Sequence, residues 1–289
     1  TSSGAVTVTD SIFGYNESSH RGGAIFTDSG SVTVNGSTFG ENEADADGGA
    51  IGAGSGDVSV SASSFTSNTA ADDGGAIWAF DGDVSVSTSS FTSNTATADD
   101  GGAIYCQNGA ASVSASTFSS NSAGDNGGAV MADGSVSVVG STFTSNQAAD
   151  DGGAVNIFTG AVTVSTSTFS GNTATNDGGA IRGYESVQVS SSTFNGNQSG
   201  DTGGAIAAEG VAGGIELDFS TVAGNTTSGG ASAALDSTGD ATVTNSIAYG
   251  NTGSDVQAGG SLSVSFSLFT STSSVSPTVS GSSLIFGED

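Results

Sequence analysis

The sequence contains no lysine and only two arginines, against 29 acidic residues, so its net charge is −27 at pH 7. A surface of that sign repels the phosphates of nucleic acids and the anionic lipids of membranes, and we expect neither as a partner. The charge favours cations, salty surroundings or basic partners instead.

Cysteine and long apolar runs are also scarce. The single cysteine excludes a disulfide framework within the chain. No apolar run approaches the ~18 residues of a membrane-spanning helix, so we expect no membrane span. The start at Thr1 lacks the basic and then apolar stretch of a secretory signal, which indicates that such a segment was removed or was never present.

What the chain has in quantity is a repeat, and the stretch from Phe65 to Ile77 is its type copy. It joins the motif FxxN to GGA followed by Ile or Val. The Gly-Gly pair recurs every 25 to 27 residues, beginning at Gly22, Gly48, Gly74, Gly101, Gly127, Gly152, Gly178 and Gly203, with a degenerate copy at Gly229. A fixed period in this range indicates one supersecondary unit stacked on itself. Because hydrophobic residues are 35% of the chain and fall at fixed positions, a packed core is available, which argues against disorder.

Each repeat predicts three short strands. The stretch from Val58 to Ser61 alternates valine with serine, which is typical of a strand with one buried face. A second strand surrounds the Phe of FxxN, and a third follows Gly-Gly. Three short strands in ~26 residues cannot pair within one repeat, so each pairs with its copy ~4.8 Å away in the next. This predicts an all-β, single-stranded parallel β-helix (β-solenoid) of roughly ten coils, right-handed by the usual preference of parallel crossovers.

The unbroken repeat predicts a single elongated domain over residues 1–289. Regular repeats cover residues 1–210, and residues 211–289 form degenerate coils in which Val222 and then Ala248 replace the Phe. We expect strand alternation to continue to Phe269 and Pro277 to end a strand. Because neither end has an obvious capping helix, the end coils are expected to expose unpaired backbone, which is also a docking surface.

The Asn of FxxN recurs in every coil, and we expect its amides to stack as a buried ladder at a turn. The ladder residues are Asn16, Asn42, Asn68, Asn94, Asn121, Asn146, Asn172, Asn197, Asn225 and Asn251. A Ser stands two residues before each Phe, as Ser63 does, and we expect it at a corner rather than as a nucleophile.

Acidic residues form two columns just before Gly-Gly. Stacking places like charges ~5 Å apart, which costs roughly 1 kcal/mol per neighbouring pair in water. A hard cation would reverse that cost, and Ca²⁺ takes carboxylate oxygens, so Ca²⁺ is the one cofactor that we predict. A solvated acidic ridge in high external salt is the alternative. The predicted metal-binding residues are Asp47, Asp72, Asp73, Asp99, Asp100, Asp125, Asp150, Asp151, Asp177 and Asp201.

A stripe of aromatic residues follows the Ile of GGAI. Since that Ile points inward, the residues one and three positions later are expected to point outward. We predict that they form an exposed binding face, at Phe26, Trp78, Phe80, Tyr105, Met131, Phe158 and Tyr184. The alternatives are that a neighbouring segment covers them, or that a register shifted by one residue buries them. Small residues between them, such as Ala79 and Cys106, favour the interior for the intervening column.

Few residues are suited to catalysis. The only cations, Arg21 and Arg182, lie six repeats apart, and His20 is the single histidine, so neither a lyase site nor a Ser-His-Asp triad is expected. A two-carboxylate glycan-active enzyme is a lesser alternative. An ice-binding protein is another, because the Val strands present rows of hydroxyls, although Val139, Gln188 and Glu216 interrupt them.

GGAI and FxxN, recurring in phase from Phe13 to Asn251, resemble the repeats of the polymorphic outer membrane protein family. The resemblance implies an extracellular or cell-surface location and a non-enzymatic role, often adhesion. We therefore predict a structural surface protein that associates with itself, as a head-to-tail filament or a surface layer, through its open coil ends and its aromatic face. The alternative is an adhesin that binds a glycan or a cell-surface protein.

Overall fold

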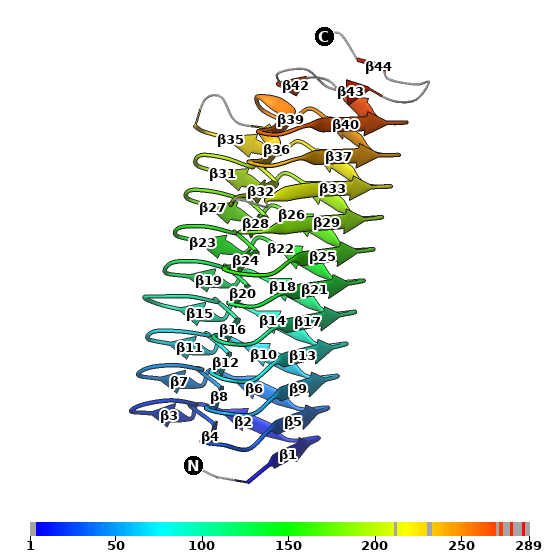
Figure 1. Cartoon of the computed structure of the whole chain (residues 1–289). Helices are drawn as coiled ribbons and strands as arrows, with labels where there is room; N and C mark the ends of the chain where they lie inside the picture. The colour runs from blue at the N-terminus through cyan, green and yellow to red at the C-terminus, as the bar shows by residue number, and fades with distance from the viewer. Residues whose placement is uncertain are drawn as a thin grey trace.

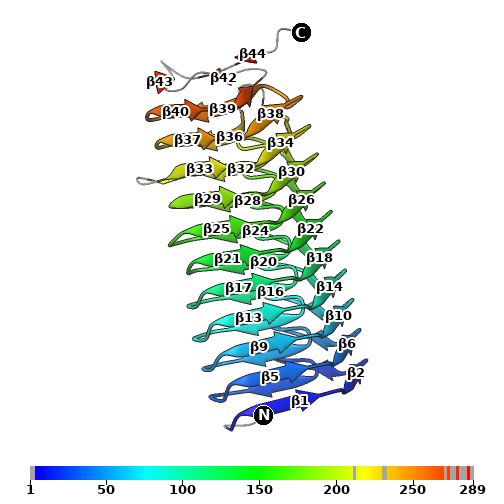
Figure 2. The ribbon, with the colours of Figure 1, turned by 90° about the vertical axis from the view of Figure 1, so that its right-hand side faces the viewer.

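The computed structural model describes residues 4–210, 213–229, 233–269, 272–273, 278–279 and 285–286. Within these residues the chain is built from short parallel strands that stack into four sheets along one axis (Figure 1). Two views at right angles show the chain winding as a right-handed coil (Figures 1 and 2). The predicted right-handed parallel β-helix is confirmed, and Pro277 lies outside the described residues.

Each regular coil visits the four sheets in the same order. The Val sheet contains β1 (Val6–Thr9), β5 (Val32–Asn35), β9 (Val58–Ser61), β13 (Val84–Ser87), β17 (Ala111–Ser114), β21 (Val136–Val139), β25 (Val162–Ser165), β29 (Ser186–Ser190), β33 (Gly214–Asp218), β37 (Ala241–Thr244), β40 (Leu262–Ser265) and β43 (Thr278–Val279). The Phe sheet contains β2 (Ile12–Gly14), β6 (Thr38–Gly40), β10 (Ser64–Thr66), β14 (Ser90–Thr92), β18 (Thr117–Ser119), β22 (Thr142–Thr144), β26 (Thr168–Ser170), β30 (Thr193–Asn195), β34 (Thr221–Ala223), β38 (Ile247–Tyr249), β41 (Leu268–Phe269) and β44 (Ile285–Phe286). The arm sheet contains β3 (Glu17–Ser18), β7 (Glu43–Ala44), β11 (Thr69–Ala70), β15 (Thr95–Ala96), β19 (Ser122–Ala123), β23 (Gln147–Ala148), β27 (Thr173–Ala174), β31 (Gln198–Ser199) and β35 (Thr226–Thr227). The Ile sheet contains β4 (Ile25–Thr27), β8 (Ile51–Ala53), β12 (Ile77–Ala79), β16 (Ile104–Cys106), β20 (Val130–Ala132), β24 (Val155–Ile157), β28 (Ile181–Gly183), β32 (Ile206–Ala208), β36 (Ala233–Ser237), β39 (Ser254–Ala258) and β42 (Thr272–Ser273).

The arm sheet is a fourth column of strands that the sequence analysis did not predict. Its two-residue strands follow the ladder Asn, and the acidic segment then runs out and back before Gly-Gly. Among the described residues the arm sheet has nine strands and ends at β35, and the chain passes from β38 to β39 without an arm strand. Nine coils are therefore complete, close to the ten that the period predicts.

The core consists of columns that each repeat one residue type. Phe65 lies in register with Phe39 and Phe91. From Phe13 to Phe194 the ring centroids of successive coils stack from 4.7 to 4.9 Å apart, which is the spacing of paired strands. The Val and Ile columns complete the same cluster. Cys106 is fully buried in it, as predicted, and burial raises the pKa of its thiol.

The Asn ladder stands at the corner between the Phe sheet and the arm. Its predicted burial is confirmed from Asn42 to Asn225, whereas Asn16 and Asn251 at its ends are half-buried. The Nδ2 of Asn68 donates to Asn94 Oδ1 at 2.9 Å and to the Phe39 carbonyl at 3.1 Å. Its Oδ1 accepts from the Asn42 backbone N–H at 3.1 Å and from Asn42 Nδ2 at 2.8 Å. Both amide atoms are thus satisfied in each coil, which allows the side chain to be buried without cost in lost hydrogen bonds.

The Gly-Gly pair is required where the arm turns back onto the Ile sheet. Gly74 has φ +62°, in the left-handed region that favours glycine. A Cβ on Gly75 would lie 2.2 Å from the Gly102 carbonyl oxygen of the next coil. The pair therefore lets the returning backbone pack directly against its neighbour.

Candidate functional site

The inner acidic column consists of the residues directly before Gly-Gly: Asp47, Asp73, Asp100, Asn126, Asp151 and Asp177. The structure brings them together as predicted, and it gives them a structural task. Asp73 Oδ1 accepts the backbone N–H of Asp100 at 3.0 Å, and Asp151 Oδ1 accepts that of Asp177 at 2.9 Å. Asn126 fills the same place with its amide oxygen. From Asp73 to Asp177, each side chain thus holds the backbone of the next arm.

Burial of this column opposes the ionisation of its carboxyls. Burial raises the pKa of Asp73 to about 7, and the nearby Asp100, Asp47 and Asp99 add to the shift. Burial likewise raises the pKa of Asp100 to about 6, although hydrogen bonds from Asn126 partly offset it. The middle of the column therefore holds protons more tightly than ordinary aspartates do.

The outer acidic column lies one residue earlier, towards the tip of the arm: Asp72, Asp99, Asp125, Asp150, Asn176 and Asp201. Its side chains are exposed or half-buried. Burial and the neighbouring Asp150 raise the pKa of Asp125, and Asp150 accepts a hydrogen bond from the Asn176 amide. Among the described residues no group of three His, Cys, Asp or Glu side chains is arranged to hold a metal ion. Ca²⁺ binding by the two columns stays a prediction.

The predicted exposure of the aromatic stripe is wrong for its central members. Trp78, Tyr105 and Met131 are only 1%, 6% and 0% exposed, and Phe26 is half-buried against them. They do leave the main core on the outer side of the Ile sheet, as the alternation predicts, and they form a second hydrophobic cluster there.

The returning arm is the neighbouring segment that covers this second cluster. A Cβ on Gly101 would lie 2.9 Å from Tyr105 Cβ, and one on Gly127 would lie 2.9 Å from Met131 Cβ. The outer face of the Ile sheet is therefore an interior face between the sheet and the arm. The sequence does contain the signal, because glycines three and four residues before a large side chain leave room for it.

Both arginines of the chain lie in this band between arm and sheet. Arg21 pairs with Asp47 at 2.7 Å, and its guanidinium carbon lies 4.4 Å from the Trp78 ring centroid. Arg182 pairs with Glu209 at 3.2 Å and with Asp151 at 3.6 Å. The only two cations of the chain thus serve the inner acidic column at two separate points.

Three members of the stripe are exposed as predicted: Phe80 at 37%, Phe158 at 41% and Tyr184 at 48%. They lie just beyond the Ile-sheet strands. Phe80 contacts the buried cluster, with its ring 5.7 Å from that of Trp78. The stripe therefore exposes three separate aromatic side chains instead of a continuous face. A binding role for these side chains stays a prediction.

The sequence analysis missed the Phe-sheet face, which is the outer side of the Phe sheet with its two flanking corners. In seven successive coils this face contains no acidic or basic residue, over residues 62–68, 88–94, 115–121, 140–146, 166–172, 191–197 and 219–225. Ser and Thr occupy most of its outward positions, and Thr142, for example, is in register with Thr117 and Thr168. The acidic residues of these coils lie on the arm, in the turns between the Ile and Val sheets, on β33 and, as Asp236, on β36.

Large apolar side chains are exposed at both ends of the Phe-sheet face. Ile12 and Tyr15 are 84% and 75% exposed in the first coil. At the other end a C-terminal patch consists of Phe219, Ile247, Tyr249 and Phe266, which are 66%, 42%, 50% and 60% exposed. Each replaces the small or polar residue that the regular repeats have at that position, and this departure is the sequence signal for the patch.

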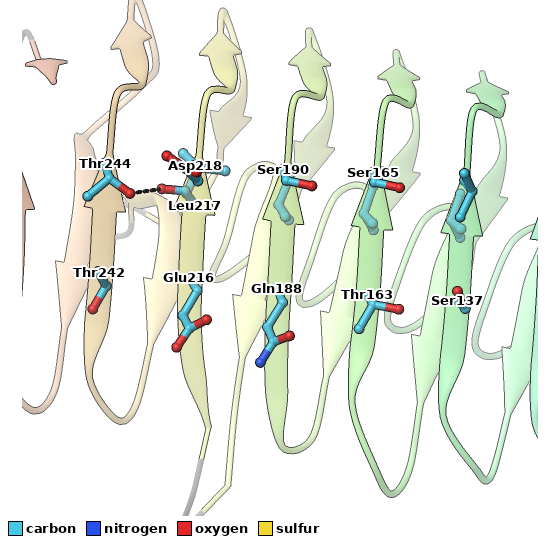
Figure 3. Close-up of a pocket in the computed structure, with 14 residues that line it drawn as sticks. Ser137, Thr163, Ser165, Gln188, Ser190, Glu216, Leu217, Asp218, Thr242 and Thr244 are labelled. Atoms are coloured by element: carbon cyan, nitrogen blue, oxygen red, sulfur yellow. Dashed lines mark hydrogen bonds between the residues drawn. The ribbon is translucent and has the colours of Figure 1, made fainter. Parts of the chain in front are cut away.

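A shallow depression of about 530 Å³ lies on the outer face of the Val sheet. Figure 3 shows two rows of polar side chains there, with Gln188 and Glu216 side by side on neighbouring strands. Hydroxyls of Thr163, Ser165 and Thr242 flank them. The depression has the hydroxyl, amide and carboxylate groups that bind sugar hydroxyls.

In the part of the chain that the structure describes, no helix is long and apolar enough to cross a membrane. A search of curated proteins and a search of solved structures each gave no significant match.

A family model does match the repeats. The model of the Chlamydia polymorphic membrane protein repeat matches five times, at residues 62–79, 88–107, 115–133, 166–184 and 191–209. Each match runs from the corner before the Phe strand to the end of the Ile strand or just beyond it, and so includes the Phe, the ladder Asn and the Gly-Gly bend. These repeats indicate a surface- or outer-membrane-associated protein. The chain is therefore a parallel β-helix built from repeats of the polymorphic membrane protein type.

Proposed function

We propose that this chain is a non-enzymatic surface β-helix that functions by associating with copies of itself. The observation that carries the proposal is the Phe-sheet face, which is free of acidic and basic residues over seven coils of a chain with net charge −27. Like charges on the arms and in the turns between the Ile and Val sheets oppose the approach of two such molecules along those sides. On this face two copies can meet without burying unpaired charge.

The proposal shifts the contact from the aromatic stripe to the side of the rod. The arm covers the middle of the stripe, so Trp78, Tyr105 and Met131 are not available for contact with a partner. Head-to-tail stacking through the coil ends is a further mode of assembly.

Sedimentation velocity over a range of concentrations tests the proposal. We expect association that strengthens as NaCl rises from about 0.1 to about 1 M, because the Debye length falls from ~10 to ~3 Å and screens the acidic arms. A protein that stays monomeric at every concentration and salt level contradicts it. Negative-stain images with Ca²⁺ and with chelator test the metal: assemblies that dissolve only in chelator support Ca²⁺ binding by the acidic columns.

A second candidate function is adhesion to a neutral glycan, which the depression on the Val sheet favours. Its polar rows follow the strand spacing of the sheet (Figure 3). A glycan array identifies a ligand, and Gln188→Ala and Glu216→Ala are expected to weaken its binding. Binding that survives both substitutions places the ligand elsewhere.

A further inference from the structure

We infer that two copies of the chain pair side by side, with parallel axes, through their Phe-sheet faces, and that the C-terminal patch supplies the apolar contact at one end of the interface. This inference rests on the proposed self-association and adds its surface, orientation and partner. The partner is a second copy of this chain, and the argument comes from charge, area and the position of the patch.

Charge selects the orientation of the pair. A two-fold axis parallel to the β-helix axis sets each coil against the same coil of the partner and reverses the order of the columns. The two acidic arms then lie at opposite edges of the pair. An antiparallel pair would instead place both arms along one edge, where Asp72, Asp99 and their columns repel each other.

The patch is self-complementary in the parallel pair. Ile247 and Tyr249 stand on the outer side of the same strand, β38, two residues apart. Because the two-fold axis reverses the order of the columns, Ile247 of each copy lies against Tyr249 of the other, which gives two equivalent contacts. Phe219 and Phe266, on the corner beside them, widen the apolar contact.

Charge on this face is confined to the end far from the patch. Asp10 and Glu41 are its acidic residues, in the first two coils, and Glu41 accepts a hydrogen bond from Tyr15 at 2.8 Å. Nine strand steps separate β2 from β38, which is about 43 Å at ~4.8 Å a step. That distance is several Debye lengths at about 0.1 M salt.

The area of the face is sufficient for a weak interface. The uncharged strip from β10 to β38 is seven strand steps, or about 34 Å, long and four residues, or about 13 Å, wide, which gives roughly 440 Å² per copy. Two copies bury roughly 900 Å² together, in the range of weak and transient contacts. We therefore expect a reversible pair instead of an obligate dimer.

Sedimentation equilibrium of the full chain tests the surface with matched variants. Ile247→Ser with Tyr249→Ser is expected to raise the dimer Kd at least about tenfold. The control is Phe158→Ser with Tyr184→Ser, whose side chains are 41% and 48% exposed, against 42% and 50% for the patch pair. The control is expected to leave the Kd within about twofold. Equal effects of the two pairs overturn the inference.

Cysteine cross-linking with a short bismaleimide tests the orientation. Cys106 is fully buried and unreactive in the folded chain. A mixture of Ile247→Cys and Tyr249→Cys proteins is expected to give cross-linked pairs of the two unlike variants, identified by mass, and a mixture of Ile247→Cys and Ile12→Cys proteins is expected to give no unlike pair. Cross-linking of the second mixture alone overturns the parallel pair.

A second variant covers the case in which the patch substitutions prevent folding. Thr193→Asp adds one charge to an exposed position of the face, and it is expected to weaken pairing while the melting temperature stays close to wild type. If Thr193→Asp and the patch variants associate as strongly as the wild type does, the inference is refuted, while the proposed self-association is not. A wild-type chain that never associates refutes both.

Discussion

Two ladders of side-chain oxygens run along this β-helix and perform the same task with different chemistry. In the Asn ladder, Asn121 Oδ1 accepts the backbone N–H of Asn94 at 3.0 Å. In the inner acidic column, Asp100 Oδ1 accepts the backbone N–H of Asn126, also at 3.0 Å. Both ladders therefore fasten one coil to the next through a carbonyl-type oxygen. They differ in what the second atom of the side chain does.

The second atom of an amide is a donor, and the second atom of a carboxylate is another acceptor. Asn121 Nδ2 donates to Asn146 Oδ1 at 2.9 Å and to the Phe91 carbonyl at 3.1 Å, so the amide ladder satisfies itself and is fully buried. The carboxylate ladder adds a negative charge at each step and relies on Arg21, Arg182 and Asn126 to relieve it. A neutral ladder can be long and buried, whereas an acidic one stays partly exposed and interrupted.

The largest effect is expected when asparagine is replaced by aspartate in the Asn ladder, and the same replacement in the inner acidic column provides the comparison. Asn121→Asp removes two donated hydrogen bonds and places a charge at a fully buried site, so we expect it to lower the free energy of unfolding by about 3–5 kcal/mol. Asn126→Asp puts a carboxylate where Asp100 and Asp151 already stand in the flanking coils, and we expect a cost of about 1 kcal/mol. Urea unfolding at about pH 7.5 measures both.

The comparison depends on the difference between these two costs. If Asn126→Asp destabilises the chain as much as Asn121→Asp does, the two ladders are equivalent and the distinction between them is wrong. Asn121→Ala serves as the uncharged control, because it removes the two donated hydrogen bonds, together with the two that Oδ1 accepts from Asn94, without adding charge. Its cost is expected to lie between the two, at about 2 kcal/mol.

A third ladder, formed by serine hydroxyls, extends the comparison, because one hydroxyl oxygen both accepts and donates a hydrogen bond. The hydroxyl of Ser116 accepts the backbone N–H of Ser89 at 3.1 Å and donates to the Ser114 carbonyl at 2.7 Å. Ser116→Ala leaves the buried Ser89 N–H without its acceptor, so we expect a loss of about 1–2 kcal/mol in urea unfolding.

Ser112→Ala is the matched control for this ladder, since its side chain lies exposed on the Val sheet. It is expected to change the free energy of unfolding by less than about 0.5 kcal/mol. A Ser116→Ala variant as stable as Ser112→Ala would mean that water replaces the missing acceptor and that the corner ladder contributes nothing.

The features that could be predicted from sequence are those that repeat with one residue type. Phe65, Asn68 and Ile77 recur in phase, and a buried column forces identical residues to stack, so the strands, the core and the Asn ladder follow from periodicity alone. Burial within the core can be predicted from the alternation of strand residues alone, and this alternation correctly predicts that Cys106 is buried.

The aromatic stripe could not be predicted in the same way, because its exposure depends on a segment outside the alternating strand. Alternation places Trp78 on the outer side of the Ile sheet, and only the path of the arm decides whether solvent reaches it. The C-terminal patch was missed for the opposite reason. Ile247 and Phe219 are departures from the repeat, and they emerge only when each coil is compared with its neighbours in register.

The smallest expected effect is the removal of one charge from the acidic ladder. Asp73→Asn keeps the oxygen that accepts the Asp100 N–H and copies the arrangement already present at Asn126. Because burial raises the pKa of Asp73 to about 7 from its ordinary 3.8, ionisation of this carboxyl disfavours the folded state. The substitution should therefore stabilise the chain above that pH, by about 1 kcal/mol once solvent screening of a partly exposed group is allowed for.

The sign of the pH dependence separates this explanation from a general loss of repulsion. Between about pH 4 and pH 7 the folded state retains a proton on Asp73 that the unfolded state has released, so the stability of the wild type falls as pH rises through this window. The Asp73→Asn variant lacks this pH-dependent loss of stability. Its advantage over wild type should be near zero at about pH 4, grow towards pH 7 and stay constant above it.

Asp72→Asn is the control, because it removes an equal charge from an exposed side chain in the same arm. If the two variants gain the same stability at about pH 8, net charge is the cause and the buried ladder is no different from the exposed one. A larger gain for Asp73→Asn, absent at about pH 4, assigns the cost to the burial of a carboxylate where the other ladder uses an amide.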